Sequence, residues 1–80
     1  MPTGYETHLD NFKDLLKDCF RLMKRYLADE LDLQLRSKNK EIYILDKNGN
    51  NVEIEQVHCL IQADVKLQRE VYNIWMTTYH

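Results

Sequence analysis

Few side chains in this 80-residue chain could take part in chemistry, and they are His8, His58, His80, Cys19 and Cys59. His58 and Cys59 are adjacent, but neighbouring residues on a helix point about 100° apart, so the imidazole is badly placed to activate that thiol. Cys19 falls among apolar residues, as a small core residue does, whereas Cys59 falls on the polar side of its predicted helix. The pattern contains no catalytic constellation, and we expect that the protein is not an enzyme.

Asp46, Asn48 and Asn50 have the spacing of the first ligands in a calcium-binding loop. Such a loop also needs glycine at its sixth position and glutamate at its twelfth, where this chain has Asn51 and Val57. We therefore interpret the segment as a turn, and we predict no metal and no other cofactor.

The composition is that of an ordinary globular protein, with 44% hydrophobic and 30% charged residues. Eighty residues suffice for one small domain, which we expect to span residues 1–80. The 13 acidic and 11 basic residues are interspersed, so no strong positive field is expected to hold a polyanion. The polar N-terminus, the lack of a long apolar run and the sparse cysteines indicate a soluble protein of a reducing compartment, the cytoplasm.

The elements that position these residues begin with an amphipathic helix, predicted over about residues 8–29. Thr7 can cap its first backbone N–H groups. The apolar face is unusually broad and is formed by Leu9, Phe12, Leu15, Leu16, Cys19, Phe20, Leu22, Met23, Tyr26 and Leu27. Glu30 would fall in the centre of that face, so we expect the helix to end before it.

Alternating apolar and polar residues then predict three strands, at about residues 31–36, 41–46 and 51–54. A four-residue loop between the first two would pair Leu35 with Ile42. A bulged turn with Gly49 in the left-handed conformation would pair Ile44 with Val52. In this register the side chains of Tyr43 and Leu45 would point away from the core.

A second helix is predicted over about residues 55–79, which completes the order α-β-β-β-α. We expect a two-layer α+β fold in which both helices pack on one face of a three-stranded antiparallel meander. This order of elements is similar to that of double-stranded-RNA-binding domains, and the likeness is one of topology. Such domains need positive charge facing the duplex, whereas the predicted start of this helix carries Glu53 and Glu55.

The helix-one cations and a lysine loop keep a nucleic-acid-binding regulator open as the alternative function. Lys38 and Lys40 lie in the loop, and the helix contributes Lys13, Lys17, Arg21, Lys24 and Arg25. However, aspartates precede several of these cations by three residues, the spacing of ion pairs within a helix. We therefore expect a solvated, ion-paired face and regard nucleic acid as the less favoured partner.

Two polar residues interrupt the apolar stripe of the second predicted helix. Asp64 and Gln68 lie one turn apart, between Leu60 and Tyr72. Buried polar groups must be hydrogen-bonded, so either they have internal partners or they form a polar patch within a protein interface. The sequence leaves both possibilities open.

Further candidate interface residues are apolar or aromatic. In the preferred register, Tyr43 and Leu45 face away from both helices, and the last helix carries Tyr72, Trp75, Met76 and Tyr79. Residues of these types are enriched in interface cores. If Asn48 and Gly49 instead formed a two-residue turn, Tyr43 and Leu45 would join the core.

These observations predict a non-enzymatic protein–protein interaction module. We expect it to act as a homodimer or as a small adaptor or inhibitor that docks on a larger protein, with no membrane contact and no small-molecule substrate. A mildly acidic chain of this size would suit an accessory protein of a virus or mobile element that binds a host protein.

Overall fold

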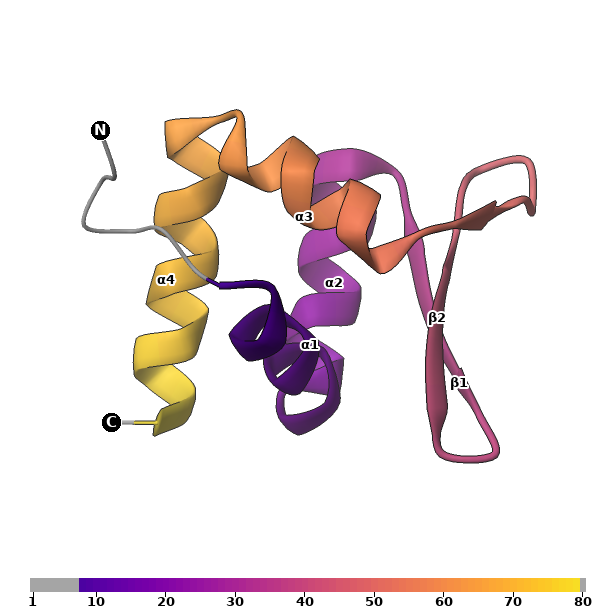
Figure 1. Ribbon diagram of the computed structural model, residues 1–80, viewed down its shortest axis with the longest axis horizontal. Coiled ribbons are helices and arrows are strands. Elements are labelled where there is room, and N and C mark those ends of the chain that lie inside the picture. The colour runs from indigo at the N-terminus through magenta and orange to yellow at the C-terminus, as the bar shows by residue number, and fades with distance from the viewer. Residues whose placement is uncertain (1–7, 80) are drawn as a thin grey trace.

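The structure is a computed structural model, and residues 8–79 of it are described (Figure 1). Its helices are α1 (Leu9–Asp18), α2 (Phe20–Leu31), α3 (Ile54–Gln62) and α4 (Val65–Tyr79), and its strands are β1 (Gln34–Lys38), β2 (Glu41–Leu45) and β3 (Asn51–Val52). The strands form one antiparallel sheet in the order β1-β2-β3, so β1 is an edge strand. The predicted α+β class is confirmed. Thr7 and His80 lie outside the described residues.

The first predicted helix is in fact two helices, α1 and α2, which are separated at Cys19. This residue leaves the helical conformation, with φ −123° and ψ 47°. The bend lets the two halves face different elements. The first helix, α1, packs against α3, whereas α2 packs against β1. The broad apolar stripe of the sequence thus belongs to two helices with different neighbours, and Leu22 within it remains 45% exposed.

The second predicted helix is also two helices, and its interruption lies at Ala63 and Asp64. Asp64 is exposed, and its carboxylate accepts the backbone N–H of Lys66 at 2.9 Å. An aspartate that accepts the N–H groups of the following residues starts a new helix, and the helical spacing of the apolar residues on both sides of Asp64 did not reveal this start. The strand before α3, β3, is shorter than predicted, because Ile54 is already the first residue of α3.

The hairpin of β1 and β2 has a different register from the expected one. Leu35 lies opposite Ile44 rather than Ile42. The connection is a two-residue turn, in which Asn39 and Lys40 have φ angles of 53° and 68°. Positive φ at both positions matches the twist of the strands, although lysine rarely adopts it. Because the register differs by two residues, Leu35 and Ile44 still share the buried face.

The turn between β2 and β3 has the predicted form. Gly49 adopts a φ of 85°, and Ile44 lies opposite Val52. The Asp46 carboxylate accepts the backbone N–H of Asn50 at 2.9 Å, and this hydrogen bond is the main reason that the pKa of Asp46 lies below its usual value. The segment with calcium-loop spacing therefore uses its first carboxylate to hold its own turn.

One core joins the helices to the buried face of the sheet. It consists of Phe12, Leu15, Leu16, Met23, Tyr26, Leu27, Leu33, Leu35, Ile44, Val57, Ile61, Leu67 and Val71. Figure 1 shows the hairpin projecting at one end of the molecule, next to α2 and α3, while α4 lies at the other end. Surfaces on β1 and on α4 are therefore far apart.

Candidate functional site

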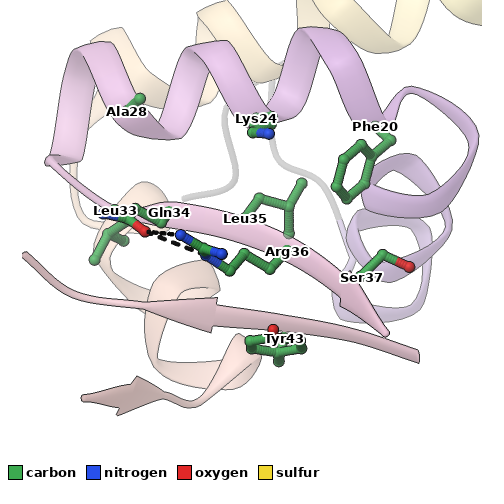
Figure 2. A pocket seen from close by; sticks show the side chains of 9 residues that line it. All are labelled: Phe20, Lys24, Ala28, Leu33, Gln34, Leu35, Arg36, Ser37 and Tyr43. Atoms are coloured by element: carbon green, nitrogen blue, oxygen red, sulfur yellow. Dashed lines mark hydrogen bonds between the residues drawn. The ribbon is translucent and has the colours of Figure 1, made fainter. Parts of the chain in front are cut away.

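A groove of about 580 Å³ runs between α2 and β1 (Figure 2). Its size falls within the range of ligand-binding clefts in proteins. It is lined by Phe20, Lys24, Ala28, Leu33, Gln34, Leu35, Arg36, Ser37 and Tyr43. We call it the α2–β1 groove.

One wall of the groove is a single stripe of α2. Phe20, Lys24 and Ala28 are spaced four residues apart, so they follow one side of the helix. At about 1.5 Å per residue this stripe is about 12 Å long. Phe20 is half-buried, and the Lys24 ammonium lies 5.9 Å from the centre of its ring, a cation–π distance.

The other wall is the free edge of β1. Pairs in an antiparallel ladder alternate between hydrogen-bonded and non-hydrogen-bonded, and the pair that flanks a two-residue turn is hydrogen-bonded. Here that pair is Lys38 and Glu41, so Leu35 and Ser37 belong to non-hydrogen-bonded pairs. Their backbone N–H and C=O groups consequently point away from β2, along the edge that lines the groove.

The groove carries positive charge in a protein whose net charge is −2. Lys24 projects from α2 and Arg36 from β1, and none of the lining residues is acidic. The Arg36 guanidinium donates two hydrogen bonds to the side-chain oxygen of Gln34, at 3.0 and 3.3 Å. These bonds hold the guanidinium beside the groove, where its remaining N–H groups can meet an anionic group.

Two of the predicted interface residues lie on the outer face of the sheet. Tyr43 is half-buried and lines the α2–β1 groove, where it lies opposite Arg36. Leu45 is also half-buried but does not line the groove. The structure therefore brings together Tyr43 and residues that sequence reasoning had not selected.

Asp64 and Gln68, the two polar residues of the predicted stripe, lie at the junction of α3 and α4. Asp64 is an exposed helix cap, so its expected place within an apolar stripe is wrong. Gln68 is buried, with 7% of its surface exposed, and its amide nitrogen donates to the backbone carbonyl of Gln62. Of the two possibilities left open for these residues, this geometry favours internal partners.

The aromatic residues of α4 form a ladder along that helix. The rings of Tyr72 and Trp75 are stacked at 6.0 Å, and those of Trp75 and Tyr79 lie 5.7 Å apart. Trp75 also packs on the core, and Met76 is half-buried. Tyr79 donates a hydrogen bond of 2.5 Å to Asp18, which raises its pKa to about 12. Part of this predicted surface thus fastens the end of α4 to the end of α1.

The predicted basic face is only partly ion-paired. Lys13 contacts Glu55 at 3.2 Å and Arg25 contacts Asp29 at 3.8 Å. Lys13 also lines a smaller hollow of about 280 Å³ with Lys17, Lys40 and Glu41, among others. An acidic residue therefore accompanies this group of lysines, unlike the two cations of the α2–β1 groove.

The histidine and cysteine candidates do not come together. His58 packs beside Phe12 with the ring centres 5.5 Å apart, and Cys59 is exposed. The half-buried Cys19 lies 2.8 Å from the hydroxyl oxygen of Thr78. Within residues 8–79, no three His, Cys, Asp or Glu side chains are grouped so that they could hold a metal ion.

Sequence reasoning missed most of the groove. Phe20 was assigned to the core face and Lys24 to a solvated face, while Arg36 and Ser37 were treated only as strand and loop residues. The available signal was the presence of Arg36 beside Gln34 on the polar side of an edge strand. It could not be linked to α2 without knowing that the helix turns at Cys19 and lies against β1.

No protein-family model, curated protein or solved structure shows a significant match to this chain. Among the described residues, no helix combines the length and the apolar character needed to cross a membrane.

Proposed function

We propose that the protein is a non-enzymatic protein–protein interaction module and that the α2–β1 groove is its docking surface. The carrying observation is the free edge of β1 lying in an open groove that also presents aromatic and cationic side chains. Aromatic residues and arginine are enriched at the energetically important centres of protein interfaces. In this role the chain would act as an adaptor or an inhibitor of the protein that it binds.

The aromatic ladder of α4 supports the proposal less strongly. Its tyrosine hydroxyl at position 79 is engaged by Asp18, and Trp75 packs on the core. Residues that hold an element in place are less free to contact a partner. The groove residues Lys24 and Arg36, in contrast, do not belong to the hydrophobic core.

Site-specific photo-crosslinking in cells that express the protein tests this function. A photoreactive phenylalanine analogue in place of Ala28, at the exposed rim of the groove, should give a discrete protein adduct. The same analogue in place of Asn73, exposed on α4, is the matched control and should not give that adduct. Arg36→Glu should abolish the adduct, whereas Arg69→Glu, with the same charge change on α4, should retain it. Equal adducts from both positions, or an adduct indifferent to Arg36→Glu, would contradict the proposal.

A nucleic-acid-binding regulator is the second candidate, supported by the lysines that share the smaller hollow. Lys17 and Lys40 both line it, and phosphate contacts from such residues dominate nucleic-acid affinity. Retention on duplex RNA at low salt, lost steeply as salt rises and weakened by Lys17→Glu, would favour this candidate. Because Glu41 lines the same hollow, we expect no such retention.

A further inference from the structure

We propose that the α2–β1 groove binds an extended, acidic peptide segment of the partner protein, which adds to the sheet as a fourth strand beside β1. This inference rests on the proposed function and specifies the chemistry of the partner. Strand addition at a free sheet edge is a recurrent mode of peptide recognition, in which backbone hydrogen bonds supply affinity and side-chain contacts supply specificity.

The dimensions of the groove fit an extended segment of about four residues. The α2 stripe from Phe20 to Ala28 is about 12 Å long. The extended edge segment from Leu33, just before β1, to Ser37 within β1 has nearly the same length, since a strand rises about 3.3 Å per residue. Along that edge the backbone groups of Leu35 and Ser37 point away from β2 and can pair with the N–H and C=O groups of an incoming strand.

The charge of the groove favours acidic side chains on the incoming segment. Successive side chains of a strand point to opposite faces of the sheet. On the α2 side they would meet Lys24 beside Phe20, and on the outer side Arg36 beside Tyr43. Each face therefore offers one cation next to one aromatic ring, which suits a segment with both carboxylate and apolar residues on each face.

The same charges argue against a second copy of this chain at the edge. Pairing of two β1 strands would bring Arg36 and Lys38 of both copies into one short interface, where like charges repel. Nucleic acid is disfavoured for a different reason. A strand edge presents backbone groups for another peptide backbone, and only two cations line the groove to meet phosphates.

Titration of the isotope-labelled protein with a defined peptide tests the inference by nuclear magnetic resonance. The probe is an end-blocked peptide made of Glu-Glu-Val-Val repeats, which puts carboxylates and apolar side chains on both faces of a strand. We expect binding that shifts the Leu35 and Ser37 amide signals and slows their hydrogen exchange. Arg36→Glu should weaken binding by about tenfold or more, while Arg69→Glu leaves it unchanged.

Two peptide controls need no change in the protein, so a folding defect cannot imitate their results. A Lys-Lys-Val-Val peptide should not bind, and the acidic peptide with every backbone nitrogen methylated should lose binding because it has no backbone N–H group to donate to the β1 edge. The inference is overturned if either control binds as well as the probe, or if millimolar acidic peptide leaves the Leu35 and Ser37 amides unperturbed.

Further outcomes identify a different occupant. Perturbation of the same amides by oligothymidylate in place of the peptide would assign the groove to nucleic acid, and their perturbation by raising the protein concentration alone would assign it to a second copy. If the Ala28 photo-crosslink captures a partner but the acidic peptide does not bind, the proposed function stands and the acidic-strand inference fails. If the peptide binds but no cellular adduct forms, the chemistry of the groove stands and the proposed function fails.

Discussion

Tyr26 is the residue whose single polar atom joins two helices across the core. It is 8% exposed, and its hydroxyl donates to the backbone carbonyl of Leu67 at 3.1 Å. Burial, and secondarily the negative charge of Glu70, raises the pKa of the phenol above its ordinary value. The hydroxyl therefore stays protonated, and its hydrogen bond holds α2 against α4.

Removal of this hydroxyl should lower stability without disturbing the fold. Tyr26→Phe is expected to reduce the free energy of unfolding by about 1 kcal/mol, the usual contribution of a buried hydrogen bond. Urea denaturation followed by circular dichroism measures it. Tyr43→Phe is the matched control, because the Tyr43 hydroxyl makes no hydrogen bond within the described residues, and its effect should stay within about 0.5 kcal/mol. Equal effects of the two substitutions would show that the Leu67 contact contributes nothing.

At the scale of single residues, the sequence identifies which groups need a partner but not which partner they find. Gln68 stood out because an amide among apolar residues must be hydrogen-bonded. Its acceptor, the Gln62 carbonyl, lies near the end of α3, where no following turn of the same helix uses it. Since the end of α3 was itself not foreseen, the acceptor could not be named from the sequence.

Among the elements, the junction of α3 and α4 depends on one side chain. The Asp64 carboxylate accepts the N–H of Lys66 at 2.9 Å and approaches that of Leu67 at 3.4 Å, and it stands at the positive end of the α4 dipole. Its backbone carbonyl also accepts the Gln68 N–H at 3.0 Å. These contacts make Asp64 the cap of α4.

Loss of the cap should destabilise the protein but leave the groove intact. Asp64→Ala is expected to lower the free energy of unfolding by about 1 kcal/mol, whereas Asp64→Asn, which retains a capping oxygen, should lose less. Thermal denaturation compares the two with Asn73→Ala, an exposed control within α4. Unchanged stability in Asp64→Ala would refute the capping role. If Asp64→Ala were as stable as the unsubstituted protein but no longer bound the acidic peptide, Asp64 would instead belong to a binding interface.

The strands show where local patterns suffice and where they do not. The turn at Gly49 was predictable, because glycine is the residue that readily adopts a φ of 85°. The turn at Asn39 and Lys40 was not, since lysine at positive φ is unusual and a four-residue loop satisfied the alternation equally well. Both registers keep Leu35 on the buried face, so the hydrophobic pattern could not decide between them.

At the scale of the whole molecule, polar contacts join the C-terminal end of α4 to the C-terminal end of α1. Tyr79 at the end of α4 donates to Asp18 at the end of α1. Beside it, Thr78 donates to the Ile74 carbonyl, so the thiol of Cys19 is the donor in its 2.8 Å contact with the Thr78 oxygen. The helix bend at Cys19 and the last turn of α4 therefore stabilise each other.

This fastening should fail at high pH. The hydrogen bond to Asp18, and then burial, raise the pKa of Tyr79 from 10.0 to about 12. Because the folded pKa is the higher one, the stabilisation is fully present below pH 10.0 and is lost as the pH rises through about 12. Besides the buried Tyr26, whose pKa is also raised, near-ultraviolet absorbance should show a second late-titrating tyrosine, which disappears in Tyr79→Phe and titrates earlier in Asp18→Asn. If Asp18→Asn leaves its titration unchanged, the contact does not control this group.

At the scale of the whole molecule, the sequence predicted the fold class but not which of the candidate residues lie together on one surface. The candidate interface residues were chosen as one group, yet Tyr43 lies beside β1 whereas Trp75 lies on α4 at the other end of the molecule (Figure 1). Hydrophobic periodicity reports which side of an element is apolar. It does not report which elements become neighbours, and that was decided by the breaks at Cys19 and Asp64.

The position of the α2–β1 groove along the chain has a consequence for the order of folding. Both walls come from residues 20–43, joined by the left-handed Asp32, with a φ of 55°, and by the Leu33 N–H bonded to the Leu27 carbonyl at 3.1 Å. Segments that are close in sequence meet at a small entropic cost and early in time. The chain can therefore assemble the α2–β1 groove while it is still being synthesised, before α3 and α4 have left the ribosome.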